Sequence, residues 1–98
     1  MEKRIPHVPL VRVLELVRTG QYEIRLSALR GAAELGWGSD DIVKTVLSLA
    51  RSDFYKSMTT YADHRVWQDV YRPKTLAGIL YLKLTVTENV IVVSFKEA

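Results

Sequence analysis

The spacing of apolar residues changes near residue 52, and this change limits the fold more than any other feature of the sequence. Before it, apolar side chains recur every three or four residues, which is typical of helices with one buried side. After it, apolar and polar residues alternate, which is typical of strands in a half-buried sheet. We therefore expect an α+β fold, with N-terminal helices packed on one face of an antiparallel sheet made by the C-terminal half.

Three helices are expected in the first half. The first covers residues 10–17 and stops before Gly20, the second begins with Ser27 as its N-cap and ends at Gly36, and the third begins with Ser39 as its N-cap. The apolar positions that define these helices are Leu10, Val13, Leu14, Val17, Ala28, Leu29, Ala32, Leu35, Ile42, Val43, Val46, Leu47 and Leu49. We interpret these stripes as core-facing sides.

The strands are expected to follow, with a two-residue turn at Glu88–Asn89 joining the last two. Their predicted ranges are 54–60, 66–72, 79–87 and 90–97, with a further short strand at 22–25. With Thr87 opposite Val90, one face of the final hairpin carries only apolar pairs, namely Leu82–Phe95, Leu84–Val93 and Val86–Ile91. The other face pairs Tyr81 with Lys96 and Lys83 with Ser94. Burial favours this register because a slip of one residue would oppose apolar to polar positions.

Length and composition narrow the class of protein. The 98 residues fit a single domain, 1–98, and no apolar run exceeds four residues, so no membrane helix or signal-peptide core is expected. The absence of cysteine excludes disulfides and thiolate zinc sites and fits a reducing compartment such as the cytoplasm. A net charge of +3 permits an anionic partner without requiring one.

Aromatic and basic side chains are interleaved in the strand half. Seven of the nine Phe, Trp and Tyr residues lie there: Phe54, Tyr55, Tyr61, Trp67, Tyr71, Tyr81 and Phe95. The interleaved cations are Lys56, Arg65, Arg72, Lys74, Lys83 and Lys96. Rings that stack on unpaired bases, beside cations that bind phosphates, are typical of single-stranded RNA binding. The alternative is that most rings belong to the core and the cations form a solvated face.

Common catalytic motifs are absent. The sequence has no phosphate-binding G-x-x-x-x-G-K-[ST], no G-x-S-x-G and no H-E-x-x-H. Asp40–Asp41 is expected to start a helix rather than to hold a metal ion. His64 could act as a general acid or base, although a surface role is the simpler interpretation, and His7 offers less.

Long strings in the second half carry a resemblance to a known family. They are SDFYKSMTTYADH, WQDVYRP, GILYLKLTV and VIVVSFKEA, and the opening MEKRIPH agrees as well. These strings resemble the motility quorum-sensing regulator (MqsR) toxins. The resemblance spans the chain and is densest over 52–98. It implies a RelE-like fold and the toxin half of a type II toxin–antitoxin pair, an mRNA interferase that prefers GCU sites and acts without the ribosome.

The resemblance also implies partners and a site. The substrate would be mRNA, no metal or other cofactor is expected, and a zinc-binding antitoxin like MqsA would neutralise the toxin and alone connect it to DNA. No membrane partner is expected. The implied catalytic residues are Lys56, Gln68, Tyr81 and Lys96. The neighbouring Tyr55, Met58 and Arg72 are expected to bind substrate.

These groups suit cleavage in which the RNA's own 2′-OH attacks the adjacent phosphorus. Lys56 and Lys96 would neutralise the phosphate oxygens, Tyr81 would transfer a proton, and Gln68 would orient the reacting groups. Two other classes of protein stay open at this point. One is a noncatalytic RNA- or DNA-binding regulatory module, and the other is a protein-interaction domain.

Overall fold

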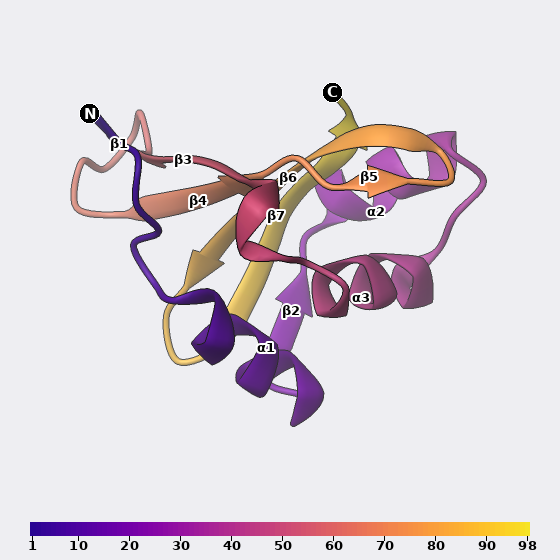
Figure 1. Cartoon of the computed structure of the whole chain (residues 1–98), viewed down its shortest axis with the longest axis horizontal. Helices are drawn as coiled ribbons and strands as arrows, with labels where there is room; N and C mark the ends of the chain where they lie inside the picture. The colour runs from indigo at the N-terminus through magenta and orange to yellow at the C-terminus, as the bar shows by residue number, and fades with distance from the viewer.

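Three helices and a seven-stranded sheet make up the fold. The computed structural model describes all 98 residues. In chain order the elements are β1 (Glu2–Lys3), α1 (Leu10–Arg18), β2 (Tyr22–Ile24), α2 (Leu26–Glu34), α3 (Ser39–Leu47), a 3₁₀ turn η1 (Arg51–Asp53), β3 (Phe54–Thr59), β4 (Trp67–Tyr71), β5 (Lys74–Thr75), β6 (Gly78–Val86) and β7 (Val90–Glu97). Figure 1 shows α2 and α3 on one side of β6 and β7, with the loop between β3 and β4 at the opposite end of the molecule. This is the expected α+β class, consistent with a RelE-like toxin fold.

The sheet is mixed rather than purely antiparallel. Its strand order is β1-β3-β4-β6-β7-β2, with β5 paired to β6 off this path. The short strand β2 runs parallel to β7, and every other pair is antiparallel. Strands from the first half therefore form both edges of the sheet, which the sequence did not indicate for β1.

The helices cover one face of the sheet, here called the helix face. Its largest buried side chains are contributed by β6, β7 and β4, and Leu82, Phe95 and Tyr71 are all fully buried. The helices contribute Val13, Leu16, Val17, Ala28, Ala32, Ile42 and Val46 to the same apolar cluster. Helix α2 approaches β7 so closely that a Cβ atom built on Gly31 would lie 1.8 Å from the carbonyl oxygen of Phe95. Only glycine fits at that contact.

The register of the β6–β7 hairpin is as predicted near its open end and wrong near its turn. Tyr81–Lys96, Leu82–Phe95 and Lys83–Ser94 are paired as expected. Beyond Lys83 the register shifts by one, so that Leu84 faces Val92 and Val86 faces Val90. A β-bulge at Val93 causes the shift, which leaves three residues, 87–89, to form the turn instead of two.

The predicted pairs Leu84–Val93 and Val86–Ile91 are therefore wrong. The bulge still serves burial, because it keeps both Val92 and Phe95 on the helix face.

Two predicted helix caps are also wrong. Helix α2 begins at Leu26, and the Ser27 hydroxyl donates to the Val93 carbonyl oxygen at 2.6 Å instead of capping its own helix. Helix α3 begins at Ser39 with Gly38 as the N-cap, and the Asp41 carboxylate accepts the Gly38 N–H at 2.9 Å. Asp40 and Asp41 do lie in the first turn, as expected. No helix is both long and apolar enough to cross a membrane.

Candidate nucleic-acid interface

The face of the sheet turned away from the helices, here called the outer face, carries the predicted site residues. Opposed residues of antiparallel strands point to the same side, so the pairing defines rows across this face. One row is Ser94, Lys83, Val70 and Lys56, and another is Gln68, Met58 and Glu2. Tyr81 and Lys96 form a third row on the other side of Lys83. Val70 is fully buried yet lies outside the core cluster, which agrees with cover by its long row neighbours Lys56 and Lys83.

Two tyrosine rings form the centre of the outer face. A β-bulge lies between Phe54 and Lys56, and Tyr55 is its additional residue. The rings of Tyr55 and Tyr81 pack edge to face, with centroids 6.4 Å apart and planes at 69°. Tyr55 is 39% exposed, so part of this residue is accessible to a ligand.

Five cationic side chains surround these two rings. Their distances to the ring centroids are 5.8 Å for Arg4, 5.3 Å for Lys56 and 5.2 Å for Arg72 around Tyr55, and 5.7 Å for Lys83 and 5.9 Å for Lys96 around Tyr81. Each lies within cation–π range. We call these seven residues the tyrosine–cation cluster. Such a concentration of positive charge on one face attracts a polyanion.

Lys56 has a carboxylate partner inside this cluster. Its Nζ lies 2.9 Å from Oε1 of Glu2, and the two side chains are 18% and 50% exposed. The hydrogen bond and charge of Lys56 lower the pKa of Glu2 below its ordinary value. The hydrogen bond to Glu2 raises the pKa of Lys56, and the two tyrosines add to this effect. Lys56 therefore stays protonated throughout the neutral range.

The structure brings five of the seven predicted site residues together: Tyr55, Lys56, Arg72, Tyr81 and Lys96. Gln68 and Met58 share the outer face but oppose each other farther along it. Tyr71 pairs with Leu82, so Arg72 is level with Tyr81 and Gln68 lies four residues along β4 from that level. At about 3.3 Å per residue the backbone offset is roughly 13 Å, and the Lys56 row lies midway between Gln68 and Tyr81.

Neither histidine belongs to the cluster. His7 stacks on Trp67 at 5.4 Å, and Trp67 alternates with Gln68 and so points to the helix face. The main-chain N–H groups of His7 and Val8 donate to the buried Asp69 carboxylate, which ties this segment to the same side. His64 is exposed in the loop between β3 and β4.

Two members of the site were missed from the sequence, Glu2 and Arg4. Both belong to the N-terminal segment, where β1 has only two residues and pairs with β3. Two residues are too few to show an alternating pattern. The concentration of charged residues in the opening MEKR is the one sequence signal that could have indicated Glu2 and Arg4.

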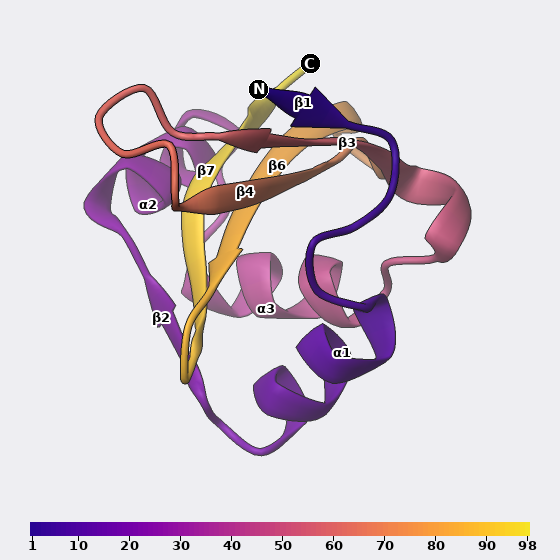
Figure 2. The same cartoon turned by 90° about the vertical axis from the view of Figure 1, so that its left-hand side faces the viewer.

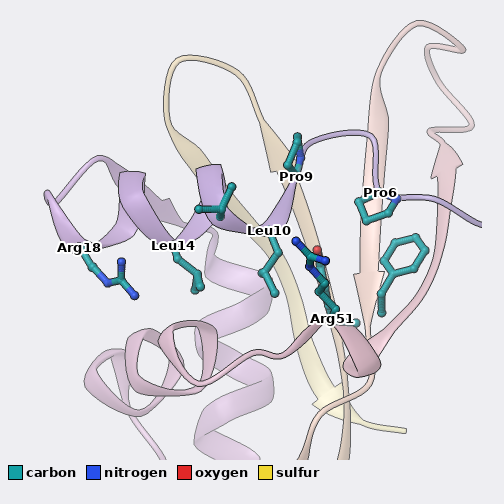
Figure 3. Close-up of a pocket in the computed structure, with 9 residues that line it drawn as sticks. Pro6, Pro9, Leu10, Leu14, Arg18 and Arg51 are labelled. Atoms are coloured by element: carbon teal, nitrogen blue, oxygen red, sulfur yellow. The ribbon is translucent and has the colours of Figure 1, made fainter.

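A cavity lies apart from the tyrosine–cation cluster, on the helix side. It has a volume of about 490 Å³ and is lined by Pro6, Pro9, Leu10, Val11, Leu14, Arg18, Arg51, Phe54 and Tyr71. Figure 3 shows Leu10 and Leu14 on the side of α1 that faces Arg51. The side-chain polar groups of this lining are two guanidinium groups and the Tyr71 phenol, whereas a smaller hollow of about 280 Å³ adjoins the cluster and includes Tyr55 and Arg72.

The comparisons with known proteins agree with one another. A family model described as "Motility quorum-sensing regulator, toxin of MqsA" matches residues 5–97. The chain is 54% identical over 97 residues to the mRNA interferase toxin MqsR of Escherichia coli strain K12, with 99% of each chain covered. A match over nearly the whole length, with this identity, shows that the chain belongs to the MqsR toxin family.

Proposed function

We propose that this protein is the toxin of a type II toxin–antitoxin pair, an endoribonuclease that cuts mRNA on the outer face of its sheet. The tyrosine–cation cluster is the observation that carries this proposal, because it combines phosphate-binding cations, ring faces and a proton-transfer group. The related protein of Escherichia coli is named an mRNA interferase toxin, which supports the same activity here. We further propose that cleavage favours GCU sites.

The proposed chemistry is internal attack by the RNA. The 2′-oxygen forms a bond to the adjacent phosphorus, the bond from phosphorus to the 5′-oxygen breaks, and the products are a 2′,3′-cyclic phosphate and a 5′-OH. One proton leaves the 2′-OH and one reaches the 5′-oxygen, while negative charge builds on the two nonbridging oxygens. No bond in this step needs a metal ion or an added water molecule.

Lys56 and Lys96 supply the positive charge in this step. The Lys56 ammonium lies 5.3 Å from the centroid of the Tyr55 ring, and the Lys96 ammonium lies 5.9 Å from the centroid of the Tyr81 ring. Compact point charges that are already in place stabilise the charged transition state. The phenol of Tyr81, whose ring packs against Tyr55, transfers one of the two protons.

The remaining predicted residues act on the RNA around the cut. Arg72 binds a flanking phosphate, for which its planar guanidinium is suited, and Tyr55 stacks on an unpaired base. Gln68 and Met58 oppose each other in the row next to Lys56, and we assign Met58 to a neighbouring nucleotide. Gln68 is proposed to orient the 2′-OH or the phosphate through neutral hydrogen bonds.

The antitoxin is proposed to be a zinc-binding protein related to MqsA, acting in the cytoplasm, and to provide the only connection to DNA. Expression of the toxin alone should arrest growth, and co-expression of the antitoxin should restore it. Growth that continues with a confirmed level of folded toxin would count against the toxin function.

The decisive assay uses a defined transcript with one GCU site and excess EDTA. We expect cleavage at that site, a cyclic phosphate at the new 3′ end, and no cleavage when the attacking 2′-OH is replaced by hydrogen. A noncatalytic RNA-binding module would bind both transcripts and cut neither. Activity that requires added magnesium would contradict the proposed charge stabilisation by lysine.

A further inference from the structure

The N-terminal strand reaches the RNA-binding face, although it lies at the far end of the chain from most of that face. β1 pairs with β3 on the side of β3 away from β4, with Glu2 opposite Met58 and Lys3 opposite Ser57 (Figure 2). The pairing is reinforced by a 3.0 Å bond from the Thr59 N–H to the Met1 carbonyl oxygen. This attachment fixes the side of the sheet to which Glu2 points.

Glu2 is the carboxylate that this strand adds to an otherwise cationic cluster. Its Oε1 atom lies 2.9 Å from Nζ of Lys56. The other cations of the cluster, Arg4 among them, have no carboxylate within ion-pair distance. The Glu2 side chain is 50% exposed, so it can move into solvent without breaking the core. Lys56 is 18% exposed and thus has little freedom to meet a second anion elsewhere.

A carboxylate and a phosphate bind an ammonium in the same way, through charge-assisted hydrogen bonds to anionic oxygens. If Lys56 is to meet a phosphate of RNA, the Glu2 oxygen has to give up part of the space it occupies. Its charge also opposes the incoming phosphate, since the two anions would lie near one ammonium.

We propose that Glu2 is a built-in competitor of RNA at Lys56, which the substrate phosphate displaces. This inference rests on the proposed function of the outer face and adds a residue that tunes substrate affinity. The competing interpretation is that Glu2 is a positioning residue that holds Lys56 in its reactive place. The two differ in sign, because removal of a competitor strengthens binding, whereas removal of a positioning residue lowers the turnover rate.

The test compares the wild-type protein with Glu2→Gln, which keeps the size and hydrogen-bonding ability of the side chain. The probe is a short GCU-containing RNA with a 2′-deoxy nucleotide at the cut site, which can be bound but not cleaved. We expect its Kd to fall about two- to fivefold at low salt, the range for an exposed ion pair. The slope of log affinity against log salt should steepen by up to about 0.7, since one more cation is free to replace counterions.

Two further variants make the result specific. Glu34→Gln removes the same charge from α2, on the helix side, where Glu34 is exposed and has no ion pair, and it should change neither Kd nor salt slope. In a Lys56→Ala background, Glu2→Gln should strengthen binding less than it does in the wild type, because the contested ammonium is gone and only the repulsion between Glu2 and the phosphate is removed. Thermal unfolding of each variant should match its parent, which excludes loss of β1 as the cause.

An unchanged or weaker affinity in Glu2→Gln, or a lower kcat with the 2′-hydroxyl substrate, would overturn the inference while leaving the ribonuclease function in place. A wild-type protein that neither binds nor cuts the RNA would instead contradict the proposed function itself. The two failures are therefore distinguishable in one set of measurements.

Discussion

The two faces of one sheet are built from the same strands and have opposite physical characters. On the helix face, Leu82 and Phe95 oppose each other and are fully buried against the helices. One residue along, on the outer face, Tyr81 and Lys96 oppose each other. Tyr81 also packs against Tyr55, and cationic side chains surround the two tyrosines. On the helix face, the burial of apolar side chains away from water stabilises the fold. On the outer face, polar and charged side chains are already positioned for a charged ligand.

This difference shows that alternating residues of one strand can serve two purposes, with the residues that stabilise the fold on one face and the residues that carry the chemistry on the other. Substitutions on the helix face should change the free energy of unfolding and leave the chemistry of the folded molecules intact. Substitutions in the tyrosine–cation cluster of the outer face should change the chemistry and leave the free energy of unfolding nearly unchanged. This separation can be broken by any variant that changes both quantities together.

The largest effect is expected for Phe95→Ala on the helix face. Removal of this fully buried ring should lower the free energy of unfolding by about 3–5 kcal/mol, measured by urea unfolding. If the variant fails to fold, Phe95→Leu should show a smaller loss in the same direction. A loss below about 1 kcal/mol for Phe95→Ala would mean that the core is not where the structure has it.

Lys96→Ala on the outer face comes next. We expect cleavage to slow by about 10²–10³, because a charge aimed at the phosphate is removed, with the unfolding free energy nearly unchanged. Lys44→Ala, which removes an exposed lysine from α3, is the matched control and should leave the rate unaltered. Equal rates for the two variants would remove Lys96 from the site.

The correctly predicted part of the β6–β7 hairpin shows how much of the register follows from the sequence. Tyr81, Lys83 and Ser94 alternate with apolar residues, so burial fixes the register there, and the outer-face neighbours of Tyr81 follow from it. From Val90 to Val93 all four residues are apolar, so no polar position fixes which side faces the helices. The bulge lies within that run, and a count of apolar pairs is unable to locate it.

Long-range contacts account for two of the other differences. Ser27 has the chemistry of an N-cap, yet its hydroxyl donates to the Val93 carbonyl oxygen at the bulge, a partner 66 residues away. The position of Glu2 over Lys56 likewise depends on a two-residue strand that pairs with β3. Local sequence carries no signal for either contact, because each depends on how distant segments meet.

Gly31→Ala tests the closeness of the helix layer to the sheet. The added methyl group would meet the Phe95 carbonyl oxygen, so α2 has to shift, and we expect a loss of about 1–3 kcal/mol in unfolding free energy. Gly38→Ala is the control, because a Cβ there has open space around it. It should lose at most about 1 kcal/mol, since alanine is a poorer N-cap than glycine. Similar losses in both variants would contradict the tight contact.

The smallest effect is expected for Tyr71→Phe. The Tyr71 hydroxyl is buried without a hydrogen-bond partner, so its removal should leave stability at pH 7 within about 1 kcal/mol of the wild type or slightly higher. Burial raises the pKa of this phenol above its usual value of 10.0, with Asp69 adding to the effect.

The sign of the pH effect follows from proton binding. Above pH 10 the unfolded state binds fewer protons at Tyr71 than the folded state. The free energy of unfolding of the wild type should therefore fall by up to about 1.4 kcal/mol per pH unit. Tyr71→Phe should not show this loss. Chemical unfolding between pH 8 and 11 measures this difference. Tyr61→Phe, at a fully exposed ring, should behave like the wild type, and parallel profiles for wild type and Tyr71→Phe would contradict the burial of the phenol.

The separation of faces is tested most directly by Tyr81→Phe, because this change removes one oxygen atom from the centre of the outer face and leaves its ring packing. Single-turnover cleavage of the GCU transcript, Kd for the 2′-deoxy RNA and the unfolding free energy should be measured on the same preparation. We predict a rate lower by about 10²–10⁴, with Kd and stability nearly unchanged, as for the loss of a proton-transfer group. A variant that cuts RNA at the wild-type rate would contradict the assignment of the chemistry to this face.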